Sequence, residues 1–268
     1  MLFRYEYQDG TWIDLEQPTE DELRDVAHEF SLDNRIEAEL LSPTPEPLVA
    51  NDSGGVLVAL HFPTQDAEND AVKNQEIDFV VGGHFIITAH YEIIAPLYQL
   101  KKLFETRGLV NRDESITTDV LLEILFAHLY ASVRDYTNHI ASRLALVEKD
   151  MFGGRERRTV RAISTINREF LHLKSSLANQ EEPLHRFLDL LARRGFFDDS
   201  FNERARHILL ERARVVRLTE THHAIATELR ETNAALLESR QNQIMRTLTI
   251  VTFGVELIAL VLSVRWLF

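Results

Sequence analysis

Glu256 is the residue whose type and position most clearly indicate chemistry. It carries the only charge between Thr247 and Val264, where every other residue is apolar, Thr, Ser or Gly. An ionisable side chain within a membrane span is costly, and such residues usually face a cavity or a partner. Thr249 lies seven residues earlier, about two helical turns, and so shares roughly the same face. Glu256 is therefore the first functional candidate in the chain.

The apolar run that contains Glu256 has the length of a membrane-spanning helix. Such a helix needs about 20 predominantly apolar residues, and no other segment of the sequence meets this requirement. The polar stretch that begins at Ser239 leads into the run, which predicts a polar helix continuing into a bilayer. A buried core helix is the alternative, but a run with no polar face would then have to be enclosed on all sides.

Asn242-x-x-Met245-x-x-Leu248-Thr249, at the junction with the apolar run, resembles the CorA family of divalent-cation channels and its ZntB-like relatives. Weaker similarities to the family's strands and helices cover most of residues 12–97. The resemblance implies a homopentamer that transports Mg²⁺, with Zn²⁺ or Co²⁺ left open as the transported or regulatory ion. The family's pore helix ends in Gly-Met-Asn, whereas an ungapped count places Trp266-Leu267-Phe268 there. A second membrane helix is also lacking, so we expect a truncated relative, a naturally single-span relative, or a subunit that needs a complete partner.

The same resemblance assigns roles to side chains near the start of the span. It implies that Asn242, Met245, Leu248 and Thr249 line the pore, and Glu256, which shares roughly the face of Thr249, is expected to line it as well. A ring of amides can hold hydrated cations, and rings of Met and Leu can close a path by excluding water. Five copies of Glu256 would attract divalent cations and form the metal site. As the surface of one helix, these residues also fit a plain seam between helices.

Charge is distributed unevenly along the chain, whose formal net charge is −13. Residues 1–100 contain twenty acidic and four basic residues, and the remainder contains 22 acidic and 25 basic residues. This balance argues against nucleic acid as a partner, because phosphate binding needs clustered Lys and Arg. Carboxylates shared between subunits suit magnesium and calcium. An acidic surface that only keeps the protein soluble explains the charge as well.

Location and activity class can be argued from composition and motifs. The sequence has no cysteine, and its amino terminus has no signal-peptide pattern, which predicts that the amino-terminal domain stays in the cytoplasm. With the predicted span and the family resemblance, the expected location is the inner membrane. No catalytic triad, metal-hydrolase helix or nucleotide loop is present, so we expect no enzyme and no catalytic residue. His61, His84 and His90 could together form a zinc site, but structural histidines are more frequent, and we expect these three to be structural.

The elements that must position these residues are predicted from periodicity. Alternation predicts a strand at 12–15, and β-rich apolar runs predict strands at 48–50, 56–62, 77–81 and 85–89. Helices are expected at 19–30, where Thr19 and Glu22 form a capping box, and at 33–41. A long helix from Thr117, a break at 151–154 and a helix over 158–177 predict an antiparallel hairpin. Pro183 and Gly195 mark the next interruptions. The last helix begins near 202, with an apolar seam formed by Ile208, Val215, Leu218, Ile225, Leu229 and Leu236.

The predicted fold class is an α/β sandwich-type cytoplasmic domain, a helical hairpin, and a very long stalk helix continuing into one transmembrane helix. The expected boundaries are 1–116, 117–200, 201–246 and 247–268. The competing hypothesis is a non-transporting, membrane-tethered oligomeric regulator. The sequence reads Arg204-Ala-Arg-His207 where the family resemblance implies a regulatory acid, so cation sensing at that level is not expected from this helix.

Overall fold

A computed structural model describes residues 1–65, 72–110 and 116–267. The chain forms two compact units, Met1–Ile140 with Glu169–His222, and Ala141–Arg168 with His223–Phe268. We call these unit 1 and unit 2. The elements are β1 (Leu2–Tyr7), β2 (Gly10–Glu16), α1 (Glu20–Glu29), α2 (Asn34–Leu40), β3 (Leu48–Asn51), β4 (Val56–Gln65), β5 (Val72–Val81), β6 (Phe85–His90), α3 (Ala95–Val110), α4 (Thr118–Asp150), a π-helical turn (Met151–Arg155), α5 (Glu156–Asn179), α6 (Glu181–Arg194) and α7 (Phe201–Leu267).

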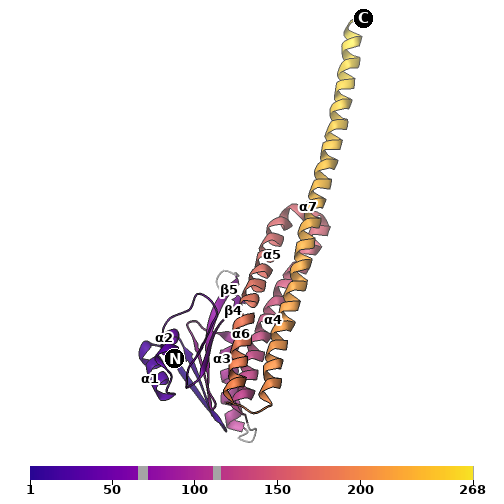
Figure 1. Ribbon diagram of the computed structural model, residues 1–268. Coiled ribbons are helices and arrows are strands. Elements are labelled where there is room, and N and C mark those ends of the chain that lie inside the picture. Colours follow the sequence, from indigo (N-terminus) through magenta and orange to yellow (C-terminus); the bar gives the residue numbers. More distant parts are fainter. Residues whose placement is uncertain (66–71, 111–115, 268) are drawn as a thin grey trace. The chain divides into compact units, whose positions relative to one another are not determined.

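Unit 1 is built on a six-stranded mixed sheet with the order β1-β2-β6-β5-β4-β3. Only the β2/β6 pair is parallel among the described pairings, with Asp14 opposite Thr88 and Glu16 opposite His90. Side chains alternate across a sheet, so Ile13 joins the core beneath α1 and α2, whereas Asp14 belongs to the opposite face. Figure 1 shows α1 and α2 on one side of the sheet and α4 and α6 on the other.

Aromatic side chains join the sheet to the helices on its second face. Phe79 of β5 stacks on Phe126 of α4 with ring centroids 4.8 Å apart, and Phe62 of β4 lies 5.6 Å from Tyr130. Phe126 also lies 6.5 Å from Phe187 of α6. All five rings are buried. Aromatic pairs in such arrangements stabilise a core beyond the area they bury, so this contact fixes the sheet against the helices.

Local sequence explains where several elements begin and end. The predicted capping box is confirmed, because the Thr19 hydroxyl accepts from the Glu22 amide and the Glu22 carboxylate accepts from the Thr19 amide. Pro183 lies in the first turn of α6, where its missing N–H costs little. Gly195 has φ 66° and ends α6. The interruption predicted at Pro183 lies slightly earlier, between the end of α5 at Asn179 and the start of α6 at Glu181. Strand β1 and helices α3 and α6 were not predicted individually.

Unit 2 contains the tip of the helical hairpin and the second part of α7. The predicted break between α4 and α5 is confirmed as the turn Met151–Arg155, in which Gly154 has φ 89°. Arg240 of α7 donates from Nη1 to the Gly154 carbonyl oxygen at 3.3 Å. The Thr159 hydroxyl and the Asn233 amide oxygen, both buried, lie 3.2 Å apart. These contacts hold the hairpin tip beside α7.

Helix α7 is continuous for 67 residues, about 100 Å at 1.5 Å per residue. Of its predicted apolar seam, Ile208, Val215 and Leu229 are buried within the chain, whereas Ile225 is 40 % exposed. The buried face instead includes polar residues and runs through Ile208, Arg212, Val215, Thr219, Ala226, Leu229 and Asn233. The buried polar residues have hydrogen-bond partners: the Arg212 guanidinium donates from Nη2 to the Leu177 carbonyl oxygen at 2.7 Å, although its buried Nε has no partner among the described residues. The seam is thus mixed.

The last part of α7 has the properties of a membrane span. Within the described residues, α7 is the one helix long and apolar enough to cross a membrane, and none of its most apolar window is buried. Side chains from 239 to 260 are all exposed. The alternative of a core helix enclosed by its own chain is therefore wrong. The boundaries proposed at 116, 200 and 246 stay predictions.

Candidate functional site

The predicted pore-lining residues lie on the exposed part of α7. At about 100° per residue, Asn242, Met245, Thr249 and Glu256 fall within an arc of about 60°. Leu248 lies about 60° beyond Met245, at the edge of this stripe. Met245 and Leu248 are 57 % and 58 % exposed. The stripe is therefore a continuous face of one helix that ends in a carboxylate, available to a partner outside the chain.

Threonine hydroxyls on this part of α7 bond to their own helix. Thr249 Oγ1 donates to the Met245 carbonyl oxygen at 2.9 Å, and Thr247 and Thr252 make the same bond to the residue four positions earlier. Such bonds satisfy a hydroxyl without a second helix. Each Thr oxygen keeps acceptor capacity, so Thr249 can still offer an oxygen to a cation or a water molecule.

Glu256 stands alone on this face. It is exposed, and no described side chain pairs with it. Its neighbours Val255, Leu257 and Ile258 are 61 %, 53 % and 61 % exposed. In a bilayer, a bare carboxylate among lipid-facing apolar groups would be strongly unfavourable. Another copy of the helix, a cation or water in a shared cavity must therefore accompany Glu256 there.

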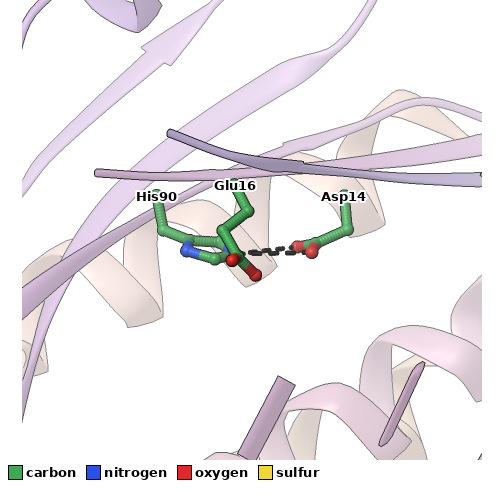
Figure 2. Close-up of side chains that lie close together, drawn as sticks. All are labelled: Asp14, Glu16 and His90. Carbon is green, nitrogen blue, oxygen red and sulfur yellow. Dashed lines mark hydrogen bonds and ion pairs between the residues drawn. The ribbon is translucent and has the colours of Figure 1, made fainter. Parts of the chain in front are cut away.

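A second set of candidate ligands was not predicted from the sequence and lies in unit 1. Asp14, Glu16 and His90 each bring one ligand atom within 4.8 Å of the others. All three come from the ends of the parallel strands β2 and β6, and Figure 2 shows their side chains converging on the same side of the sheet. We call these three residues with Lys101 the carboxylate cluster.

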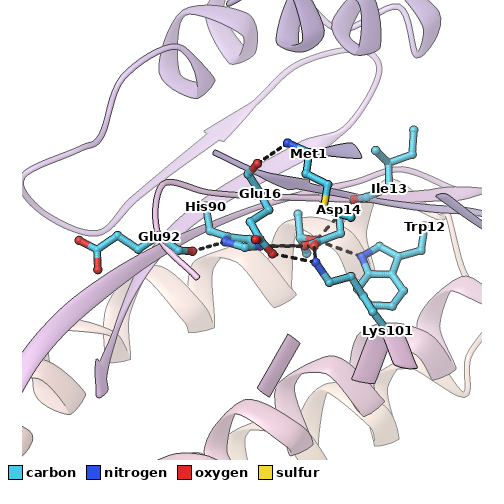
Figure 3. Close-up of polar contacts among 9 residues, drawn as sticks. Met1, Trp12, Ile13, Asp14, Glu16, His90, Glu92 and Lys101 are labelled. Atoms are coloured by element: carbon cyan, nitrogen blue, oxygen red, sulfur yellow. Dashed lines mark hydrogen bonds and ion pairs between the residues drawn. The ribbon is translucent and has the colours of Figure 1, made fainter. Parts of the chain in front are cut away.

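Lys101 of α3 closes the carboxylate cluster. Its Nζ lies 2.7 Å from Asp14 Oδ2 and 3.1 Å from Glu16 Oε2 (Figure 3). His90 Nε2 lies 3.2 Å from Asp14 Oδ1, while His90 Nδ1 donates to the Glu92 carbonyl oxygen at 2.5 Å. The His90 ring therefore has an oxygen atom within contact distance of each nitrogen.

Neighbouring polar groups orient the Asp14 carboxylate. Thr88 Oγ1 donates to Asp14 Oδ1 at 2.6 Å and accepts from Trp12 Nε1 at 3.0 Å. Burial alone would raise the pKa of the Asp14 carboxyl, but the hydrogen bond and charge of His90, with Lys101 and Thr88, hold that pKa below its usual range. Burial lowers the pKa of the Lys101 ammonium, and its bonds to Asp14 and Glu16 outweigh this and raise it.

The carboxylate cluster therefore carries its own counter-charges. Two carboxylates face one ammonium and one imidazole, and Asp14 and His90 are 0 % and 1 % exposed. The Lys101 ammonium stands where a divalent cation would contact both carboxylates. Oxygen and imidazole donors of this kind suit a divalent ion chemically, but only if Lys101 leaves. The geometry is that of a buried ion network joining β2, β6 and α3.

The three histidines that were considered as a zinc site and expected to be structural do not form one group among the described residues. Each contacts a different acid: His61 Nε2 lies 3.7 Å from Glu76 Oε2, His84 Nδ1 lies 3.4 Å from Asp9 Oδ1, and His90 contacts Asp14. Sequence spacing on separate strands could not show this divergence. The structural interpretation of these histidines is the one the geometry favours.

Asp78, next to Glu76 on the same face of β5, is an unusual buried acid. It is 1 % exposed, and neither carboxyl oxygen has a hydrogen-bond partner by distance and angle. Burial raises its pKa well above the usual range, and the neighbouring Glu76 charge adds to the effect. Burial and the Glu76 charge therefore favour the neutral, protonated form of Asp78, which avoids the cost of a buried charge.

Basic residues occupy the level of α7 where the family resemblance implies a regulatory acid. Arg204 Nε lies 2.5 Å from Asp119 Oδ2 and its Nη1 lies 3.1 Å from Glu123 Oε2. His207 Nδ1 lies 3.0 Å from Glu123 Oε1. The acids of α4 are thus engaged by basic side chains of the same chain.

Comparison with known proteins decides the family. The sequence profile described as CorA-like Mg²⁺ transporter protein matches residues 7–254, nearly the whole chain. The chain belongs to this family. The match includes both the sheet and the long helix of this CorA-like protein, and no curated protein sequence gives a match.

Solved structures share the fold of the CorA-like chain. The complete CorA magnesium transporter of Methanocaldococcus jannaschii superposes with a TM-score of 0.75 at 19 % identity, covering 93 % of this chain and 77 % of that one. The full-length CmaX protein gives 0.71 at 17 % identity, covering 91 % and 73 %. The ZntB cytoplasmic domain of Vibrio parahaemolyticus gives 0.65 at 13 % identity, covering 85 % and 89 %. The predicted fold class is confirmed.

Proposed function

We propose that this CorA-like chain transports divalent cations, magnesium first among them, across the inner membrane as a homopentamer. The observation that carries the proposal is the exposed end of α7, an apolar helix whose single interior charge is Glu256. Exposed apolar surface of this extent needs lipid around it, and a carboxylate within it needs an aqueous or cationic neighbour. A ring of helices around a shared pore meets both needs.

Magnesium is favoured by the donor atoms along the α7 stripe. Asn242, Thr249 and Glu256 offer amide, hydroxyl and carboxylate oxygens, and oxygen ligands suit magnesium better than zinc. A ring of Asn242 would hold a hydrated cation at the pore entrance. Met245 and Leu248 would form the apolar constriction that closes the path. Glu256 would be the metal site within the span. Zinc and cobalt are the other ions to be compared.

The orientation proposed places both folded units in the cytoplasm. Arg240 and Arg246 directly precede the apolar run, and basic residues flank spans on the cytoplasmic side. No catalytic residue is assigned. The second candidate function is a tethered, non-transporting oligomeric regulator, favoured by Trp266-Leu267-Phe268 at the position implied for Gly-Met-Asn.

Flux into liposomes tests the proposal. The purified chain should admit Mg²⁺ to vesicles loaded with a magnesium-sensitive dye, and Glu256→Gln and Glu256→Ala should both reduce the initial rate. Ile258→Ala, on the opposite side of the same turn, is the matched control and should keep the rate. The mass of the detergent-solubilised complex measures whether five copies assemble. A pentamer without flux of any of the three ions would favour the regulator.

A further inference from the structure

The tip of the helical hairpin in unit 2 has a surface that the proposed transport does not use. We define the hairpin tip as residues 146–161, which comprise the end of α4, the π-helical turn and the start of α5. The contact of Arg240 with the Gly154 carbonyl oxygen, at 3.3 Å, fixes the level of the tip along α7. The tip therefore lies beside the last polar turns of that helix.

The hairpin tip is close to the predicted start of the apolar span. Seven residues of α7 separate Arg240 from Thr247, or about 10 Å along the helix axis. The potential of an anionic membrane surface decays over a Debye length, about 8 Å at physiological ionic strength. If α7 enters the bilayer as proposed, charges on the tip are within reach of the lipid headgroups.

The side chains of the hairpin tip suit such a surface. Leu146, Phe152 and Val160 are 68 %, 62 % and 46 % exposed. Arg155, Arg158 and Arg161 are also exposed, and Arg155 pairs with Asp150 at 2.9 Å. The tip contains five basic and three acidic residues in a chain whose net charge is −13. Exposed apolar groups beside basic ones are the pattern of a segment that lies in a membrane interface.

We propose that the hairpin tip docks on the anionic phospholipid headgroups of the cytoplasmic leaflet. Phe152 enters the interface, while Arg158 and Arg161 contact lipid phosphates, for which guanidinium groups have matching donor geometry. This docking depends on the proposed insertion of α7 into the bilayer, and it does not depend on cation transport. It gives each subunit a second membrane contact beside its span, made by a segment of α4 and α5 distant in sequence from that span.

The absence of cysteine permits a direct test on the full chain. Phe152→Cys carries a nitroxide label in vesicles of phosphatidylcholine alone or mixed with phosphatidylglycerol. Collisions with oxygen, which is concentrated in lipid, are compared with collisions with a water-soluble nickel chelate. Ile258→Cys reports insertion of the span, and Ile93→Cys, 64 % exposed in unit 1, reports a surface with no assigned lipid contact.

Phosphatidylglycerol is expected to make collisions of the Phe152→Cys label with the nickel chelate less frequent and collisions with oxygen more frequent. Salt should reverse both changes. Each Arg near an anionic surface contributes enough to change the docked-to-free ratio about fivefold. Arg158→Gln should lower the docked-to-free ratio by that factor, and the double variant Arg158→Gln with Arg161→Gln should lower it further. Arg217→Gln, on α7 about 45 Å before Thr247 along the helix, should leave it unchanged.

Two results would overturn the proposal while leaving the span intact. With the Ile258→Cys label in lipid, a Phe152→Cys label that stays open to the nickel chelate in both lipids shows that the tip does not dock. A label shielded from both reagents equally in detergent and in both lipids shows that a second copy of the chain covers the tip. An Ile258→Cys label in water would instead refute insertion of α7, and the tip contact with it.

Discussion

Lys101 and Asp14 form a buried ion pair, with Nζ and Oδ2 2.7 Å apart and side-chain exposures of 8 % and 0 %. The pair joins α3 to β2, and His90 Nε2 of β6 lies 3.2 Å from the other oxygen of Asp14. Breaking such a pair from one side is costly because the remaining charge stays buried without compensation. The carboxylate cluster is thus a point at which single substitutions have large and specific effects.

Lys101→Met should destabilise unit 1 by roughly 3 kcal/mol, the scale for removing one partner of a buried pair. Thermal unfolding of the detergent-solubilised chain, followed by circular dichroism, measures the loss. Lys102→Met is the matched control, since Lys102 points to the exposed Tyr98 ring 4.6 Å away and should cost little. Equal losses in the two variants would contradict the role assigned to Lys101.

Asp14 predicts a specific acid sensitivity. Its pKa is lower in the folded state than its usual value. The contribution of Asp14 to folding stability is therefore present above the unfolded pKa, about 3.9, and is lost as pH falls through the folded pKa. Asp14→Asn should therefore be less stable than wild type near pH 7, and the difference should narrow below about pH 4. Parallel stability curves from neutral to acidic pH would count against this assignment.

Asp78 should respond to pH in the opposite direction. Its pKa is raised in the folded state by burial and by Glu76. The contribution of Asp78 to folding stability is therefore fully present below the unfolded pKa and is lost as pH rises through the folded pKa. Asp78→Asn should stabilise the chain near pH 7 on the scale of a typical point mutation, about 1 kcal/mol. The gain should vanish near pH 4. A loss of stability at pH 7 would show that the carboxyl has a partner there.

Gly154 should tolerate substitution less well than its neighbour. Its φ of 89° is unfavourable for a residue with a Cβ, and that Cβ would lie 3.3 Å from Arg240 Nη2. Gly154→Ala should cost about 1 kcal/mol, measured by unfolding of the hairpin in hydrogen exchange. Gly153→Ala, which has open space and no positive φ, should be near neutral. Comparable costs at both positions would contradict the requirement for glycine at 154.

Much of the fold is predictable because local signals agree with tertiary structure. The Thr19 capping box, the apolar β-rich strands and the apolar end of α7 are each specified by residues close in sequence. The seam of α7 was less predictable, since Arg212, Thr219 and Asn233 are buried polar residues that periodicity assigns to the surface. Their partners come from α4, α5 and α6, and no local pattern specifies them.

The carboxylate cluster shows where sequence reasoning ends. One signal was available, because Asp14 lies between apolar residues in a strand where its face is also occupied by Trp12. A charge at such a position indicates a buried partner. That partner, Lys101, comes 87 positions later on another element, and His90 comes from a strand paired in parallel with β2. Only the topology brings them together. The pore-lining assignment stays a prediction, because it concerns copies of the chain around an axis.

The parallel pairing of β2 with β6 has a consequence for biosynthesis. The first hairpin to leave the ribosome, β1 with β2, finds its sheet neighbour only after residue 90 has been made, and Asp14 meets its ammonium partner later still. Non-local pairing of this kind delays closure of the core. A nascent chain arrested before α3 therefore carries an unneutralised acid and an open strand edge, the state in which a chaperone would be most needed.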